Sequence, residues 1–263
     1  MKTIRTHFQK HVWITKHILK ELSLEAMDIF GKALQDEYSR DAAYRDDNHD
    51  ILWLHNSYGE PEEMPVDIFF RTEEEMPELE LIALQHCKGK TLDIGAGAGS
   101  HALLLQQKNI PVVALDISKA AIQIMQDRGV EHTIEADLFK LQSDPFDTLL
   151  LLMNGIGITG SLDGFRTFLN QAKQLLNPGG QLIFDSSDIS YIYEDTEKPT
   201  DRYFGQVAYQ YEYQGLKGEW FNWVYLDQKT LFTIAEACGW TAELLFDDGE
   251  DQYLARLQPK DSI

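Results

Sequence analysis

The chain has 263 residues, 43% hydrophobic and 25% charged, a composition typical of a globular protein with a sizeable core. No apolar run approaches the ~20 residues that span a bilayer, and the only two cysteines, Cys87 and Cys238, provide neither a disulfide framework nor a metal motif. The cysteine usage fits a reducing compartment, so we expect a cytoplasmic protein, and the missing apolar run predicts no membrane partner. A formal net charge of -20 would repel a phosphate backbone and argues against a nucleic-acid partner.

The first 20 residues are basic, and every acidic residue of the chain lies after them. Ile4, Phe8, Val12 and Leu19 recur at helical spacing and predict an amphipathic helix. Lys16 interrupts the apolar stretch and no A-x-A site follows, which argues against a targeting peptide. The histidines of this segment have no acidic residue between them, which argues against a metal site; they are His7, His11 and His17. Translation from Met27 would omit the segment, and intact-mass measurement would test this.

The next part of the chain predicts a cap that precedes the core. Residues 23–46 predict a helix with one apolar face. Residues 51–80 mix aromatic residues with glycine and proline and predict an irregular segment. We therefore expect residues 1–80 to form a helical and irregular cap, and residues 81–263 to form the core. A hairpin inserted at about 203–226 interrupts that core.

The run 92–100 is the most informative feature of the sequence. Three glycines, Gly95, Gly97 and Gly99, occupy alternate positions directly after an acidic residue, Asp93, in a short apolar strand. Glycine is required where a strand-to-helix turn takes positive φ or lies against a ligand, and the helix that follows offers unpaired N–H groups. A dinucleotide motif would place its third glycine at position 100, which is Ser100 here.

The residues after this motif predict further strands of a parallel α/β sheet, and most of these strands end in an acidic or amide side chain. Residues 112–115 lead into Asp116 and residues 133–136 lead into Asp137. Residues 147–153 lead into Asn154, and the fifth strand, which follows a turn at 178–180, ends at Asp185. Ligands of such sheets bind outside the carboxyl ends of the strands, so these side chains are expected to meet at one site.

The pattern D-x-G-x-G-x-G, the acidic strand ends and the L-x-P-G-G turn together resemble the class I methyltransferases that use S-adenosylmethionine. The motifs occur in the family's order between residues 92 and 185. The resemblance implies a Rossmann-like, seven-stranded, mostly parallel sheet of order 3-2-1-4-5-7-6, with helices on both faces. It also implies S-adenosyl-L-methionine as cofactor and S-adenosyl-L-homocysteine as product.

The resemblance also assigns roles to individual residues. Asp93 would orient the cofactor's ammonium group, Asp116 would accept from the ribose hydroxyls, and Asp137 with the next backbone N–H would bind the adenine edge. Arg71 is a candidate for the cofactor carboxylate. The whole implied cofactor set is Arg71, Asp93, Gly95, Ala96, Gly97, Gly99, Asp116, Ile117, Asp137, Leu138, Met153 and Asn154.

Each assignment has a simpler structural alternative. Asp116 could cap the following helix, Asp137 could be a solvated loop residue, and Arg71 could form a surface ion pair. Asn154 and Asp185 are the candidate catalytic residues, although Asp185 could instead cap the turn that follows it. The sequence identifies neither a general base nor a metal site.

The last part of the chain predicts an antiparallel hairpin, from 206–213 and 219–225, followed by a helix at 228–238 and two strands at 241–246 and 252–257. Tyr209, Tyr211 and Tyr213 share one face of the hairpin, and Phe221, Trp223 and Tyr225 share one face of its partner. These rings could wall an acceptor pocket or simply cover an exposed sheet, which strand aromatics often do. Tyr58 and His101 are further candidates for a cofactor contact, with packing as the simpler interpretation.

The favoured function is methyl transfer from S-adenosylmethionine to a small-molecule acceptor. The run 154–157 lacks the two prolines and the aromatic residue that follow the Asn or Asp of many DNA and protein amino-methyltransferases, which argues against that substrate class. A cofactor-binding regulatory protein without turnover and a protein methyltransferase stay open as alternatives. A nicotinamide oxidoreductase is disfavoured by Ser100 and by the Pro-Gly-Gly turn. The sequence assigns no acceptor and no oligomeric state.

Overall fold

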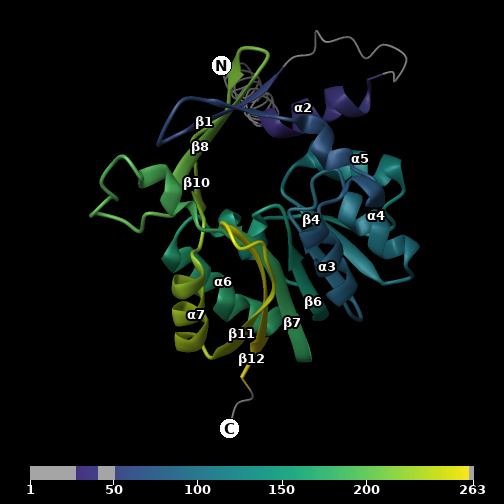
Figure 1. Ribbon diagram of the computed structural model, residues 1–263. Coiled ribbons are helices and arrows are strands. Elements are labelled where there is room, and N and C mark those ends of the chain that lie inside the picture. The colour runs from purple at the N-terminus through teal and green to yellow at the C-terminus, as the bar shows by residue number, and fades with distance from the viewer. Residues whose placement is uncertain (1–27, 41–50, 261–263) are drawn as a thin grey trace, which may run out of the picture.

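The computed structural model describes residues 28–40 and 51–260. The expectations for the basic segment at 1–20, for a start at Met27, and for residues 23–27 and 41–46 of the predicted helix lie outside these residues. Within them, the chain forms two sheets, with the larger one in the lower half of the view and the smaller one above it (Figure 1).

The larger sheet has seven strands in the order β11-β12-β7-β6-β3-β4-β5. Neighbouring strands from β7 to β5 pair in parallel, whereas β12 pairs antiparallel with both β7 and β11. Numbered within this sheet, the order is the expected 3-2-1-4-5-7-6, which confirms the predicted fold class. The strands are β3 (Thr91–Ile94), β4 (Val112–Asp116), β5 (Thr133–Glu135), β6 (Phe146–Leu151), β7 (Leu176–Ser187), β11 (Trp240–Asp247) and β12 (Gln252–Pro259).

Helices cover both faces of this sheet because alternate strand residues are apolar on both sides. Leu149 and Leu151 point toward α6 (Leu162–Leu175) and α7 (Gln228–Ala237). Leu150 points to the other face, where three further helices pack. These are α3 (Glu78–His86), α4 (Ser100–Gln107) and α5 (Lys119–Arg128) (Figure 1).

The expected turn at 178–180 is a bulge inside β7 instead. The parallel register moves from Phe146 opposite Leu176 to Thr148 opposite Gln181, so extra β7 residues are accommodated between the two pairs. Gly179 has φ of 75°, a conformation that favours glycine. The Pro-Gly-Gly sequence therefore bends a strand that has already begun, rather than connecting a helix to a strand.

The smaller sheet is the main departure from the predicted course of the chain. Residues 51–80 were expected to be irregular, but they contain β1 (Leu52–Asn56) and β2 (Glu62–Met64). β1 pairs antiparallel with β8 (Gln206–Tyr213) of the predicted hairpin. The path order is β10-β8-β1-β2, where β10 is Phe221–Val224, and a short β9 (Leu216–Lys217) also pairs with β8. The predicted hairpin is thus confirmed and lies inside a larger sheet.

Helix α2 (Ile29–Tyr38) lies between the smaller sheet and α5. Ile29 packs with Leu52 of β1, whereas Leu34 packs with Ile124 of α5. The helix ends at Tyr38, so the helix predicted to reach position 46 is shorter within the described residues. Of the helices in residues 28–40 and 51–260, none is long and apolar enough to cross a membrane.

Candidate functional site

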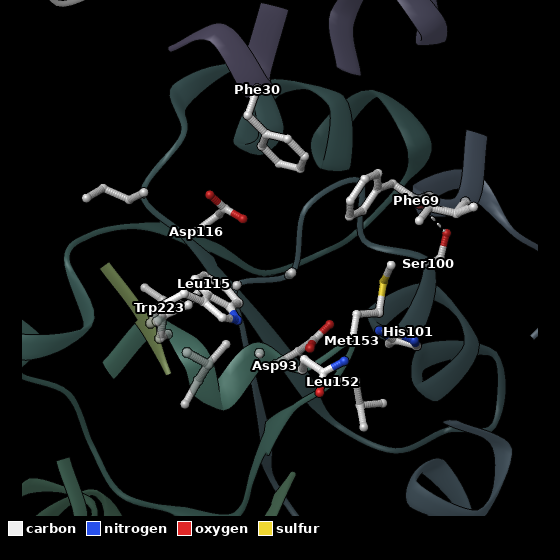
Figure 2. Close-up of a pocket in the computed structure, with 18 of the residues that line it drawn as sticks. Phe30, Phe69, Asp93, Ser100, His101, Leu115, Asp116, Leu152, Met153 and Trp223 are labelled. Carbon is white, nitrogen blue, oxygen red and sulfur yellow. Dashed lines mark hydrogen bonds between the residues drawn. The ribbon is translucent and has the colours of Figure 1, made fainter. Parts of the chain in front are cut away.

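A cavity of about 710 Å³ lies between the two sheets. Its inner part is formed where β3, β4 and β6 end, and its outer part by side chains of β1, β2, β8 and β10. Asp93 and Asp116 point into it from neighbouring strands, and Trp223 lies on the side opposite His101 and Met153 (Figure 2). The cavity thus lies at the carboxyl ends of the parallel strands, where the sequence predicts a site.

The glycine motif forms the turn between β3 and α4, and its glycines have different surroundings. Gly95 has φ of 73°, and a Cβ built there would meet no atom within 4 Å, so its open side can take a ligand. Gly99 has φ of 81°, and a Cβ there would lie 2.8 Å from Met125 Cγ, so it allows close packing against α5. The N–H of Gly97 donates to Asp116 at 2.9 Å. Only Gly95 of the three lines the cavity.

Two buried carboxylates define the inner part of the cavity. Asp93 is 2% exposed, and its Oδ2 has no hydrogen-bond partner among the described residues. Asp116 accepts from the N–H groups of Gly97 and Ser118 at 2.9 and 2.8 Å. Burial raises the pKa of both carboxyls to about 6. The helix-cap alternative for Asp116 is not what the structure shows, because Ser118 caps α5.

Asp137 lies at the rim of the cavity, between β5 and the short 3₁₀ helix η4 (Leu138–Lys140). Its carboxylate accepts from the Phe139 N–H at 2.9 Å and contacts the Lys140 ammonium at 3.0 Å. The hydrogen bond from Lys140 holds the pKa of Asp137 below its ordinary value, so this carboxylate is ionised at neutral pH.

Glu80 joins two cations at the side of the cavity next to α4. It is 5% exposed and accepts from Arg71 Nη2 at 2.6 Å, and its other oxygen lies 2.8 Å from His101 Nε2. Burial alone would lower the pKa of His101, but the Glu80 hydrogen bond and the nearby Asp93 charge outweigh it and raise that pKa. Arg71 therefore forms an ion pair as the structural alternative proposed, although a largely buried one that lines the cavity.

The loop after β6 has a strained backbone. Met153 and Asn154 have φ of 61° and 56°, values that non-glycine residues seldom adopt. Both oxygens of Asp185 lie 2.9 Å from the Asn154 N–H, and Ser187 Oγ donates to Asn154 Oδ1 at 3.1 Å. Burial raises the pKa of Asp185 to about 7. Asn154 lines the cavity, whereas Asp185 lies behind it.

Most of the predicted site residues are brought together by the fold. Those in the cavity lining are Arg71, Asp93, Gly95, Ala96, Asp116, Ile117, Asp137, Leu138, Met153 and Asn154. Gly97, Gly99 and Asp185 are not in the lining. Glu80 was not predicted as a site residue. The pattern that could have indicated it is a carboxylate on a predicted helix between two candidate cations, Arg71 and His101. No group of three or more potential metal-ligating side chains suited to a metal ion occurs in residues 28–40 and 51–260.

The smaller sheet directs aromatic rings into the outer part of the cavity. Tyr209, Tyr211, Phe221, Trp223 and Tyr225 all line it. Their rings contact one another along the sheet, with centroids of Tyr211 and Phe221 5.1 Å apart and those of Phe221 and Trp223 6.2 Å apart. Tyr213 lies on the same face of β8, as predicted, but packs against α2 and is not in the cavity lining. The aromatic face thus covers a cavity rather than an exposed sheet.

The sheet order, the glycine turn and the acidic strand ends define a class I methyltransferase. A family model described as a methyltransferase domain matches residues 85–230, which is more than half of the chain. The crystal structure of a methyltransferase from Bacteroides fragilis, described as S-adenosylmethionine-dependent and in complex with S-adenosylhomocysteine, has a TM-score of 0.81 to this chain. The two are 38% identical, over 89% of this chain and 96% of that one. This chain belongs to the family of S-adenosylmethionine-dependent methyltransferases.

More distant relatives share less. The CcbJ methyltransferase of Streptomyces caelestis is 14% identical, with a TM-score of 0.54 over 71% of this chain and 94% of that one, and shares the fold alone. The ribosomal RNA small subunit methyltransferase C of Citrobacter koseri is 30% identical over 105 residues. That match covers 37% of this chain and 31% of the relative, so the chain spans about a third of the length of such curated relatives.

Proposed function

We propose that this methyltransferase acts on a small-molecule acceptor, with the cofactor in the inner part of the cavity and the acceptor in the outer part. The observation that carries this proposal is the position of the cavity between the two sheets, where acidic groups lie on one side and aromatic rings on the other. The described part of the predicted 1–80 cap, at 28–40 and 51–80, and the 203–226 insertion then act as the acceptor-binding cap on the core that follows residue 80.

The residues of the inner part fit S-adenosylmethionine. Asp93 Oδ2 and Arg71 Nε are buried without a hydrogen-bond partner among the described residues, so each is available to a ligand. Asp93 would take the ammonium group and Arg71 the carboxylate of the cofactor. The open side of Gly95 would admit its methionine portion. Buried polar groups are normally paired, which supports a ligand at these two atoms.

The nucleoside half would lie further along the same edge. Asp116 would accept from the ribose hydroxyls and Asp137, with the Leu138 N–H, would bind adenine; Ala96, Ile117 and Met153 would pack against the cofactor. When bound, S-adenosylmethionine supplies a methyl group on a positively charged sulfur, already activated for transfer. The protein orients the two partners and excludes water, effects that can supply roughly 7–11 kcal/mol. Asp185 would act as a positioning residue because it holds Asn154 beside the acceptor.

The charge of the chain supports a small acceptor over RNA. A protein that grips RNA needs cationic surface, and the net charge here is -20. The ribosomal RNA methyltransferases match this chain over only 31% of their length. We expect no binding to a 16S ribosomal RNA fragment in a filter assay at 50 mM salt, and tight, salt-dependent binding there would contradict the proposal. The free Cys87 and Cys238 support a cytoplasmic location.

Calorimetric titration with S-adenosylmethionine, S-adenosylhomocysteine and NAD tests the cofactor assignment. We expect binding of the two adenosyl sulfur compounds and none of NAD. Acceptors would then be screened by release of S-adenosylhomocysteine. Binding of the cofactor without product from any small-molecule pool would favour the non-catalytic regulatory alternative, and methylation of a protein fraction would favour a protein substrate.

A further inference from the structure

Three tyrosine hydroxyls and one carboxylate form a chain across the smaller sheet. Tyr225 Oη lies 3.0 Å from Tyr209 Oη, which lies 3.0 Å from Tyr58 Oη. Tyr58 Oη donates to Glu62 Oε1 at 3.1 Å. Tyr209 and Tyr225 line the cavity, whereas Tyr58 and Glu62 do not, and Glu62 is exposed on β2. The chain therefore runs from the cavity to the surface of the protein.

The carboxylate end fixes the direction of every hydrogen bond in this chain. An ionised carboxylate only accepts, so Tyr58 donates its single proton to Glu62 and must accept from Tyr209. Tyr209 has then used its own proton and must accept from Tyr225. Burial raises the pKa of Tyr58, Tyr209 and Tyr225 above the ordinary tyrosine value, so all three hydroxyls keep their protons. Asn56 Nδ2 also donates to Glu62 Oε1, at 3.0 Å, and holds the carboxylate in place.

The end of the chain at the cavity is consequently a hydrogen-bond acceptor. The proton of Tyr225 points to Tyr209, and the lone pairs of Tyr225 Oη are left for a ligand. Tyr209 is the single partner that the described residues offer to this hydroxyl. A tyrosine hydroxyl whose proton is free to rotate could either donate or accept a hydrogen bond. The position of Glu62 therefore decides that the cavity presents an acceptor to its ligand.

The other groups of the cavity lining disfavour an anion. Its two cationic residues, Arg71 and His101, lie beside Glu80 in the inner part, where Arg71 would take the cofactor carboxylate, and Asp93, Asp116 and Asp137 add negative charge. Tyr211, Phe221 and Trp223 offer a row of ring faces, which bind a flat ring by stacking.

On the basis of the proposed function, we propose that the outer part of the cavity binds a flat, uncharged aromatic acceptor that carries an N–H or O–H group. Tyr225 Oη accepts a hydrogen bond from that group. Tyr209, Tyr58 and Glu62 are positioning residues because they set the direction of the chain. An aromatic carboxylate, or an aromatic ether that can only accept, binds poorly at the same place.

Three probes of the same ring system test this by calorimetry on the full chain saturated with S-adenosylhomocysteine. The probes are 2-naphthol, 2-methoxynaphthalene and 2-naphthoate. We expect 2-naphthol to bind about tenfold more tightly than 2-methoxynaphthalene, which corresponds to one hydrogen bond, and 2-naphthoate to bind least. Equal affinities for naphthol and methoxynaphthalene, or preferred binding of naphthoate, would overturn the inference. Failure of S-adenosylhomocysteine to bind would instead contradict the proposed function.

Variants along the chain separate a directed chain from a general polar contact. Tyr225→Phe should abolish the preference for naphthol over methoxynaphthalene. Tyr58→Phe and Glu62→Leu should reduce it by at least about threefold without altering the affinity for S-adenosylhomocysteine, because each removes an acceptor from the chain. Tyr191→Phe, at a tyrosine that is 53% exposed and outside the cavity lining, serves as the matched control. An unchanged preference in both Tyr58→Phe and Glu62→Leu would show that the chain has no role.

Discussion

The indole of Trp223 lies directly against Gly157, at a position that a Cβ on Gly157 would occupy. Gly157 belongs to the 3₁₀ helix η5 (Gly155–Thr159), which follows the strained pair Met153 and Asn154. This contact joins the aromatic face of the smaller sheet to the loop after β6. The missing side chain at Gly157 is therefore what lets Trp223 reach the cavity wall.

Gly157→Ala should displace Trp223 and reshape the outer part of the cavity. Overlap with the ring system cannot be relieved by a flexible chain end, so we expect a destabilisation of about 1–3 kcal/mol in chemical denaturation. Affinity for S-adenosylhomocysteine should change little, whereas affinity for aromatic probes should fall. In a Trp223→Ala background, Gly157→Ala should cost little further stability, and additive losses would argue against the contact.

Asp116→Ala should weaken S-adenosylhomocysteine binding by about 1–3 kcal/mol, because the ribose hydroxyls lose an acceptor. Asp116→Asn keeps one acceptor oxygen, so its affinity for S-adenosylhomocysteine should lie between those of Asp116→Ala and the wild type. Asp163→Asn, at an almost fully exposed side chain on α6, is the control. Calorimetric affinity that stays at the wild-type value in Asp116→Ala would show that the strand ends do not hold the cofactor.

Glu80→Gln should destabilise the protein by up to about 3–5 kcal/mol, because Arg71 and His101 lose the carboxylate that compensates them in a buried place. The pKa of His101 should also fall, and an NMR titration would detect this. Because the pKa of His101 is raised in the folded protein, its protonation stabilises the fold fully at pH values below the ordinary histidine pKa. This contribution is lost as the pH rises through the raised pKa. The variant should therefore lose less stability than the wild type over that pH interval.

Asp185→Asn should change the pH dependence of stability in a defined direction. The folded-state pKa of Asp185 is about 7, above the ordinary value of 3.8, so the folded protein holds a proton that the unfolded chain releases. As the pH rises between these two values, the free energy of unfolding of the wild type should fall relative to that of the variant by about 1.4 kcal/mol per pH unit. Urea denaturation from pH 5 to 7 would measure the difference, and parallel curves would contradict it.

The sequence predicted the larger sheet well because its signals are local. Each strand is a short apolar run, and glycine or an acidic residue marks its end, as in Asp93 to Gly95. The parallel order followed from the family resemblance and was confirmed strand by strand. The inner part of the cavity was largely predictable for the same reason.

The smaller sheet could not be predicted in the same way. β1 and β2 are short, contain polar residues and surround Gly59 and Pro61, so they have the local signals of a loop. They become strands because β8, which follows more than 140 residues later, offers its edge to β1 (His55 pairs with Gln210). Glu80 was missed for a related reason, since its two partners come from separate segments.

The two sheets divide recognition between separate parts of one cavity. Under our proposals, the strand ends of the larger sheet select the methyl donor, and the face of the smaller sheet selects the acceptor. Substitutions on β1, β8 or β10 can therefore retune acceptor choice while donor affinity is preserved. Such a division makes the protein a suitable scaffold for directed evolution, in which a library confined to the smaller sheet would explore new acceptors on an unchanged donor site.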